Sequence, residues 1–179
     1  MKSFFVILSL SICAVVLSFC VGAFYSFNYP MKYSQVIKEF SADYKVESAL
    51  IASVVNVESS FREGVVSSKG AVGLMQLLPS TAEWLSGQMG EAFEEEKLKE
   101  AKYNLKLGSF YLAYLVDYFG DKKLAVCAYN AGQGNVSAWL KDERYSKDGK
   151  TLNKIPFKET NDYLGKVLKN YKYYKNRYK

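Results

Sequence analysis

Glu58 is the residue of this sequence whose position best suits it to chemistry. Ile51, Val54 and Val55 form an apolar stripe in the predicted helix 48–57, and Glu58 follows Ile51 by seven residues and Val54 by four. These spacings put the carboxyl group on the inward face of the helix, where lost hydration disfavours its charged form and raises its pKa. Such an acid can stay protonated near neutral pH and protonate the leaving group of a glycosidic bond. The alternative is a glutamate near a helix end that turns outward into solvent.

Other catalytic groups are scarce in the sequence. The chain has 179 residues and no histidine, which excludes Ser-His-Asp catalysis, Cys-His catalysis and zinc sites built on imidazole. Cys13 and Cys20 lie in an apolar N-terminal run and leave Cys127 alone, so we expect neither a metal cluster nor a disulfide within the domain. Glu63 lies five residues after Glu58, on a different helical face. The sequence therefore indicates one catalytic acid, without the second carboxylate that most glycosidases use.

Four short motifs follow one another along the chain. They are E-S-S-F at 58–61, G-A-V-G-L-M-Q at 70–76, A-Y-N-A-G at 128–132 and E-T-N-D-Y at 159–163. Taken together, in this order and spacing, they resemble the catalytic domain of the soluble lytic transglycosylase (SLT) family over nearly all of residues 33–169. The resemblance implies an all-α fold similar to that of goose-type lysozyme. The departures are mild: Arg62-Glu63 stands where the family often has Asn-Pro, and Leu78 often corresponds to methionine.

The resemblance also implies a role for individual residues. Glu58 matches the family's single catalytic acid and base. Seven other residues match positions that line the sugar cleft or lie beside the catalytic carboxyl group: Ser67, Met75, Gln76, Tyr129, Asn130, Glu159 and Tyr163. An amide that both donates and accepts hydrogen bonds suits a sugar, and so do tyrosine rings that can stack on it. From the residues alone, structural alternatives stay open: a turn at Gly70 and Gly73, a helix end at Tyr129 and Asn130, and a favourable charge at a helix N-terminus for Glu159.

The reaction implied by the resemblance is cleavage of peptidoglycan between N-acetylmuramic acid and N-acetylglucosamine without consumption of water. Glu58 would protonate the glycosidic oxygen and then act as the base that lets the muramoyl O6 attack C1, which gives a 1,6-anhydromuramoyl end. No metal or organic cofactor is implied. Two alternatives stay open, a hydrolytic muramidase and a non-catalytic peptidoglycan-binding scaffold. Nucleic acid is not an expected partner, because the N-terminus indicates export.

The N-terminal segment is the feature that indicates export. No charged residue lies between Ser3 and Met31, and residues 4–24 are almost wholly apolar, close to the ~20 residues that cross a bilayer as a helix. We therefore predict a membrane anchor over residues 1–31 and an extracytoplasmic SLT-type domain over residues 32–179. The alternative is a signal peptide cleaved after Ala23, which would release the domain as a secreted protein.

Helical periodicity predicts the elements that must position these residues. Besides the helix that ends near Glu58, we expect an all-α domain with the following helices: 34–44, one opened by Pro79 and a Ser80/Glu83 capping box, a central buried helix over 103–119, one from Asp121 to about Gly132, a short one from Asn135 to Leu140, and a last helix opened by Pro156. Gly120 and Asp121 are the expected end and start of their helices.

The last helix ends in a basic tail rich in tyrosine. Lys169, Lys172, Lys175, Arg177 and Lys179 occur there without an acidic residue. The structural interpretation is a solvated face that suits a helix C-terminus. The functional interpretation is contact with anionic wall polymers or lipid headgroups.

Overall fold

The computed structural model describes the backbone of residues 2–178 and the side chains of residues 12–178. The chain divides into two units, Met1–Met31 and Lys32–Lys179. The first unit contains one helix, α1 (Lys2–Asn28). Within the described residues, no helix combines the length and the hydropathy needed to cross a membrane. The predicted span over residues 4–24 lies partly outside them, because the side chains of residues 1–11 are not described, and the anchor stays a prediction.

The second unit is built from helices, as predicted. Their bounds are α2 (Ser34–Tyr44), α3 (Ser48–Ser59), α4 (Pro79–Gln88), the 3-10 helix η1 (Glu95–Lys99), α5 (Ala101–Phe119), α6 (Lys122–Ala131), α7 (Gln133–Leu140) and α8 (Lys158–Arg177). Extended pairing among the described residues is limited to two isolated bridges, Val66 with Val72 and Val72 with Leu77. The all-α fold class is therefore confirmed.

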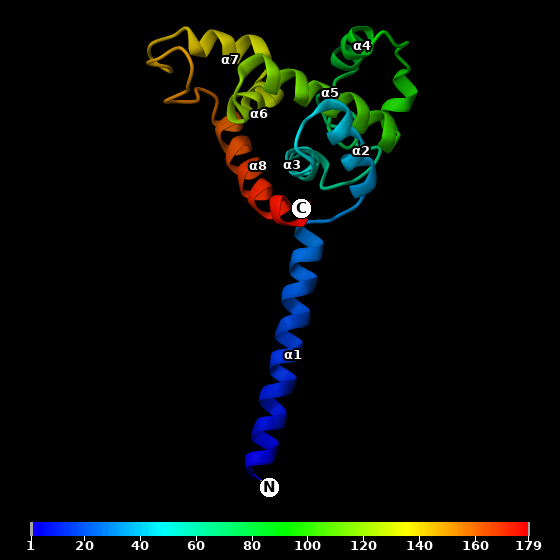
Figure 1. The fold of residues 1–179 in the computed structure, drawn as a ribbon, viewed down its shortest axis with the longest axis vertical. Helices are drawn as coiled ribbons and strands as arrows, with labels where there is room; N and C mark the ends of the chain where they lie inside the picture. Colours follow the sequence, from blue (N-terminus) through cyan, green and yellow to red (C-terminus); the bar gives the residue numbers. More distant parts are fainter. Residues whose placement is uncertain (1, 179) are drawn as a thin grey trace. The chain divides into compact units, whose positions relative to one another are not determined.

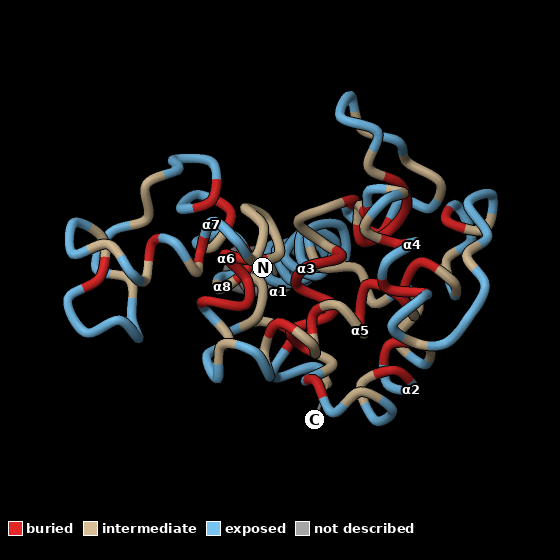
Figure 2. The backbone as a smooth tube through the Cα atoms, turned by 90° about the horizontal axis from the view of Figure 1, so that it is seen from above, coloured by how far each residue is buried: buried red, intermediate tan, exposed pale blue. Residues whose placement is uncertain are grey.

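Helix α3 lies at the centre of this unit. Every residue from Ala49 to Val55 is buried, and α3 packs against α8 and α2 (Figure 1). Helix α5 packs against α6, α2 and α4, and the buried segments gather along α3, α5 and α6 (Figure 2). Because each fully buried Val or Ile side chain stabilises the fold by roughly 1.5–3 kcal/mol, the buried segment of α3 makes a substantial contribution to the core.

The junction between α5 and α6 follows the sequence prediction. Gly120 has φ 63° and its N–H donates to the Val116 carbonyl, a left-handed helix end that glycine adopts without a Cβ penalty. The Asp121 side chain accepts hydrogen bonds from the backbone N–H groups of Lys123 and Leu124 at 2.7 and 2.9 Å. This cap satisfies donors that the first helical turn leaves open, so both predicted ends are confirmed.

The start of α4 differs from the prediction. Leu78 is the N-cap and Pro79 the first helical residue, so Ser80 and Glu83 lie within the helix and the predicted capping box is wrong. Proline fixes φ near the helical value, and its missing N–H would have no partner at this position anyway. These two properties place the helix start one residue before the serine.

The starts of α7 and α8 also differ from the prediction. Helix α7 begins at Gln133 after Gly132, and the Asn135 side chain donates to the Ala131 carbonyl at 2.8 Å instead of capping the helix. Helix α8 begins at Lys158, with Phe157 as its N-cap, two residues after the expected start at Pro156. Helix starts that lack a side-chain cap are difficult to delimit from sequence.

Candidate active site

The carboxyl group of Glu58 lies at the wall of a cavity of about 520 Å³. Glu58 sits in the last turn of α3, and the other walls come from the loop between α3 and α4, from α5, from the α6–α7 junction and from the start of α8. Six of the eight predicted site residues line this cavity: Glu58, Ser67, Gln76, Tyr129, Asn130 and Glu159. The structure therefore brings together residues from all four sequence motifs.

Burial changes the acidity of Glu58. Lost hydration raises the pKa of its carboxyl group to about 7, and the nearby charge of Glu159 also raises it. A hydrogen bond from the Tyr163 hydroxyl to Glu58 Oε1, 2.7 Å long, acts in the opposite direction, because it stabilises the charged carboxylate. Burial outweighs this bond, so the carboxyl group is half protonated near neutral pH.

Tyr163 and Met75 are the two predicted residues that do not line the cavity. Tyr163 is buried in α8 and reaches the site through its bond to Glu58. The Met75 side chain is fully buried and lies against Gly108, where an added Cβ would come within 2.4 Å of the sulfur. The Met75 backbone carbonyl accepts a hydrogen bond from the Tyr129 hydroxyl at 2.8 Å. Met75 thus reaches the site through its backbone, whereas we expected its side chain against the glycan.

Asn104 fixes the loop that carries Met75. Its side chain, fully buried in α5, accepts from the Met75 N–H at 2.8 Å and donates to the carbonyls of Val72 and Leu98 at 2.8 and 3.0 Å. Gly73 has φ 83°, and a Cβ there would lie 2.2 Å from Asn104 Nδ2. Glycine is required at this position by both the backbone conformation and the close approach.

Gln76 and Ser67 stabilise the same loop from its cavity side. The Gln76 Nε2 group donates to the carbonyls of Val65 and Gly73 at 3.0 and 2.9 Å, which supports a backbone held at φ 49°. The Ser67 hydroxyl accepts from the Ala71 N–H at 3.0 Å. Both side chains line the cavity and are held in place by the backbone beside it.

Asn130 and Glu159 form the opposite side of the cavity. The Asn130 Oδ1 atom accepts a 2.7 Å hydrogen bond from the Thr160 hydroxyl on α8, so the amide is oriented by the neighbouring helix. Glu159 Oε2 lies 3.6 Å from Lys69 Nζ, and both side chains are more than two-thirds exposed. Because the Glu159 side chain is exposed, it is accessible to a ligand. Its ion pair with Lys69 contributes little to stability, so a ligand could replace it at little cost.

Glu63 has a structural role. Its Oε1 atom accepts from the Ala101 N–H at 2.8 Å, at the first residue of α5, and its Oε2 atom accepts from the Tyr33 hydroxyl at 3.1 Å. The carboxylate therefore satisfies an open helix donor and lies in a favourable position for the helix dipole. Among the described residues, no group of three or more His, Cys, Asp or Glu side chains is arranged to hold a metal ion.

Nine residues of the cavity wall were not predicted as site residues, among them Lys69, Thr81 and Tyr111. Tyr111 belongs to the aromatic stripe of α5, which periodicity assigns to the core. Its ring packs 5.2 Å from that of Tyr129 on α6, and helical periodicity does not show this contact. Lys69 directly precedes the motif at 70–76 and Thr81 lies five residues after it, so closeness to that motif was the available signal for both.

Comparison with known proteins defines the class to which this fold and site belong. Residues 35–153 match the Transglycosylase SLT domain family, and the chain belongs to this family. Soluble lytic murein transglycosylase of Escherichia coli strain K12 is 29% identical to it over 152 residues, and membrane-bound lytic murein transglycosylase C of Haemophilus ducreyi is 31% identical over 166 residues. These alignments cover 83% and 77% of this chain.

A solved structure agrees with this assignment. The X-ray structure of an inactive glutamate-to-glutamine mutant of lytic transglycosylase Slt from Pseudomonas aeruginosa matches with a TM-score of 0.76 and 31% sequence identity, over 86% of this chain and 25% of that one. The lysozyme-like helical fold implied by the sequence motifs is thereby confirmed. The chain spans about a quarter of the soluble relative from E. coli, at 24%, and 44% of the membrane-bound one.

Proposed function

We propose that this protein is a peptidoglycan lytic transglycosylase. It cleaves the β-1,4 bond between N-acetylmuramic acid and N-acetylglucosamine and leaves 1,6-anhydromuramoyl ends. The observation that carries the proposal is the partly buried carboxyl group of Glu58, with a pKa of about 7, at the wall of a 520 Å³ cavity. The relatives named as lytic murein transglycosylases support it, and so does the inactive glutamate-to-glutamine mutant of the P. aeruginosa protein.

The pKa of Glu58 suits two successive proton transfers. In its protonated form Glu58 donates its proton to the glycosidic oxygen as the bond to C1 breaks, and the acetamide of the substrate stabilises the positive carbon. The resulting carboxylate accepts the proton of the muramoyl O6 hydroxyl while O6 bonds to C1. Glu58 ends protonated, as it began, and no water is consumed. A pKa near the working pH serves both the acid step and the base step.

The neighbouring residues orient the acid and the sugar. The Tyr163 hydroxyl, which donates to Glu58 Oε1, fixes the carboxyl group and stabilises the carboxylate that forms after the first proton transfer. Asn130 uses its oxygen to accept from Thr160, which leaves its NH₂ group to donate to an acetamide or hydroxyl oxygen of the substrate. Tyr129 and the Gln76 loop form the walls between which the glycan lies.

The position of Glu159 is the observation that favours one alternative function, hydrolysis of the glycan. It lines the same cavity as Glu58, and a second carboxylate could activate a water molecule, as in a hydrolytic muramidase. Its exposure and its proximity to Lys69 argue instead for contact with the substrate. A non-catalytic scaffold, the other alternative, would have no use for a buried acid, which is costly to keep in a protein interior.

The test is an analysis of products from peptidoglycan treated with the full chain in water enriched in heavy oxygen. A transglycosylase leaves muramic acid ends that carry no heavy oxygen and resist reduction by borohydride, whereas a hydrolase leaves reducible, labelled ends. Glu58→Gln should give no product, and the matched variant Glu143→Gln, at an exposed position, should behave like the parent. Labelled ends alone would establish the muramidase, and binding without any product would establish the scaffold.

We also propose that α1 anchors the protein in the membrane with the second unit on the extracytoplasmic side. The helix has 27 residues, and the sequence from residue 4 to residue 24 contains no charge. One of the similar proteins is itself named membrane-bound. Intact mass and membrane fractionation test this proposal, because a mature N-terminus at Phe24 in the soluble fraction would establish cleavage of a signal peptide.

Contact with anionic wall polymers is proposed for the end of α8. Tyr174 is fully buried and fixes this part of the helix, while Lys172, Lys175 and Arg177 are exposed. Lys179 lies outside the described residues. Replacing Lys172, Lys175 and Arg177 by glutamine should weaken sedimentation with cell walls at low salt, where charge attraction is least screened. Equal sedimentation at every salt concentration would leave this segment with a structural role alone.

A further inference from the structure

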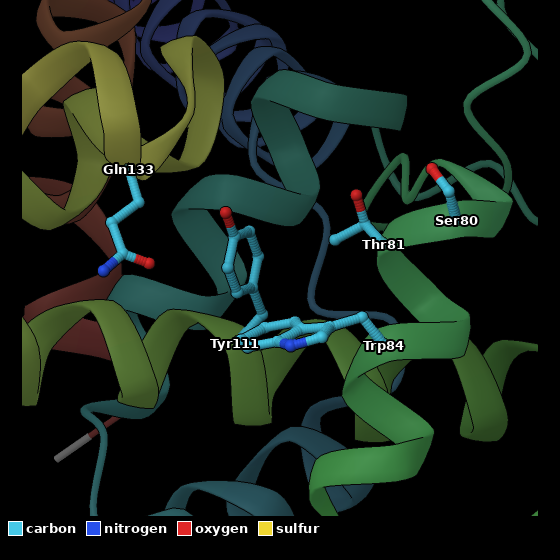
Figure 3. Close-up of a pocket in the computed structure, with 5 residues that line it drawn as sticks. All are labelled: Ser80, Thr81, Trp84, Tyr111 and Gln133. Carbon is cyan, nitrogen blue, oxygen red and sulfur yellow. The ribbon is translucent and has the colours of Figure 1, made fainter.

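A second depression adjoins the cavity of Glu58. It has a volume of about 290 Å³ and is lined by Ser80, Thr81, Trp84, Tyr111 and Gln133. Thr81 and Tyr111 also line the larger cavity, so the two share part of their walls. Figure 3 shows the rings of Trp84 and Tyr111 side by side, with Thr81 of α4 and Gln133 of α7 on either side of them. The proposed mechanism assigns no role to this depression.

Trp84 is unusual because it is both exposed and held in place. Its side chain is 41% exposed, although the same helix buries Ala82 and Leu85 completely. The indole packs edge-on against two rings of α5, with ring centroids 6.4 Å from Tyr111 and 5.4 Å from Tyr114. These contacts limit its rotation. An accessible aromatic ring that is already ordered binds a flat apolar surface with little loss of conformational entropy.

The polar groups around the two rings identify the kind of ligand. The lining residues carry hydroxyl, indole and amide groups and no formal charge. The Gln133 Oε1 atom accepts from the Tyr114 hydroxyl at 3.2 Å, which orients the amide beside the rings. An aromatic surface bordered by neutral donors and acceptors suits a sugar that has an apolar face, hydroxyl groups and an acetamide. It offers nothing to an anionic polymer, which would need cations.

The ring contacts connect this surface to the acid. Tyr129 lies beside Glu58 on the cavity wall, Tyr111 packs 5.2 Å from Tyr129, and Trp84 packs 6.4 Å from Tyr111. We propose that Trp84, Tyr111 and Gln133 form an additional saccharide subsite, in which an N-acetylhexosamine unit of the glycan strand stacks on Trp84 beyond the units held at Glu58. This inference rests on the proposed function and deepens it, because it makes long strands better substrates than short ones.

Tryptophan fluorescence tests the subsite without turnover. The sequence has two tryptophans, and Trp139 is only 7% exposed, so a response to an added sugar should come from Trp84. The full chain carrying Glu58→Gln is titrated with N-acetylglucosamine oligomers from the disaccharide to the hexasaccharide, in a detergent without a sugar headgroup. We expect an emission change with the longer oligomers. It should persist in Trp139→Phe and disappear in Trp84→Phe, which keeps an aromatic ring in the fold.

Kinetics on the active full chain give the second readout. Trp84→Ala should lower kcat/KM for long glycan strands by roughly tenfold, equivalent to about 1.4 kcal/mol, mainly through KM, and should leave the shortest cleaved substrate unaffected. Trp84→Phe should recover part of the loss. Gln133→Ala, a variant on a different helix, should weaken binding of the long oligomers in the same direction.

The outcomes separate this inference from the proposed function. Equal losses on long and short substrates, or an emission change that survives Trp84→Phe, would overturn the subsite while anhydro product still forms. Failure to form any anhydro product would overturn the proposed function, yet a length-dependent response of Trp84 would still establish the saccharide subsite. No emission change at any oligomer length, in a chain that cleaves peptidoglycan, would overturn the subsite alone.

Discussion

Replacing Glu58 by glutamine should stabilise the folded protein at alkaline pH while it abolishes cleavage. Glutamine has nearly the same shape and keeps an oxygen that can accept from the Tyr163 hydroxyl, a bond of 2.7 Å in the parent protein. Its amide has no acidic proton to donate to the substrate and no charge to bury. The variant therefore removes the chemistry and the cost of burying a carboxylate in one change.

The magnitude follows from the raised pKa. Below its ordinary pKa of 4.5 the carboxyl group is neutral in the folded and the unfolded chain, and it makes no pH-dependent difference to stability. As the pH rises toward about 7, the unfolded chain releases this proton while the folded chain retains it, which favours unfolding. Above pH 7 the cost levels off at about 3 kcal/mol for a difference of this size. Glu58→Gln should recover that amount at alkaline pH and nothing at acid pH.

Urea unfolding of the full chain at pH 4.5 and pH 8.5 measures this difference. The free energy of unfolding of Glu58→Gln should exceed that of the parent by about 3 kcal/mol at the higher pH alone, or by roughly 6–12 °C in Tm. Glu143→Gln is the control, because Glu143 is exposed and its replacement should have no such effect. A gain for Glu58→Gln that is the same at both pH values, or no gain at all, would refute the claim that burial raises this pKa.

Three further variants test the surroundings of the acid. Glu159→Gln removes a charge that raises the pKa of Glu58, so the alkaline limb of the pH profile of kcat/KM should move to lower pH, and an unchanged limb would contradict the coupling. Tyr163→Phe removes a hydrogen bond that lowers this pKa. In this variant the alkaline limb of kcat/KM should move to higher pH and kcat should fall. A shift to lower pH, as expected for Glu159→Gln, would show that the causes assigned to the raised pKa of Glu58 are wrong. Asn104→Ala breaks three buried hydrogen bonds and should lower the free energy of unfolding by about 3 kcal/mol in urea, whereas a loss below about 0.5 kcal/mol would show that the loop does not depend on it.

Sequence periodicity predicted the fold class and the inward position of Glu58, whereas the catalytic role of Glu58 rests on the family motifs. The stripe of Ile51, Val54 and Val55 is fully buried, as predicted, and the other residues from Ala49 to Val55 are buried with it, as expected for a segment that is apolar almost all round. The helix ends at Gly120 and Asp121 were predictable since each depends on a local property of one residue type. The starts of α7 and α8 were not, because no side chain caps them.

The sequence could predict the cavity only in part. Met75 was expected at the glycan, but its side chain fills the space that Gly108 leaves on α5, a contact set by packing between distant segments. Tyr111 was expected in the core, but packing between α5 and its neighbours leaves it on the cavity wall. Periodicity identifies the apolar face of a helix, but it does not show where that face passes the edge of a neighbouring helix and meets an open cavity.

The hydrogen bond between Tyr163 and Glu58 joins residues that are 105 positions apart. During synthesis, the ribosome makes α3 long before α8, and a chain that has not yet been completed or folded carries Glu58 in water, as an ordinary ionised glutamate. Folding packs α8 against α3 and closes the other cavity walls around the carboxyl group, and this burial raises its pKa. Glu58 therefore acquires its raised pKa only in the folded chain, and in partial or unfolded copies it is an ordinary glutamate that is ionised near neutral pH.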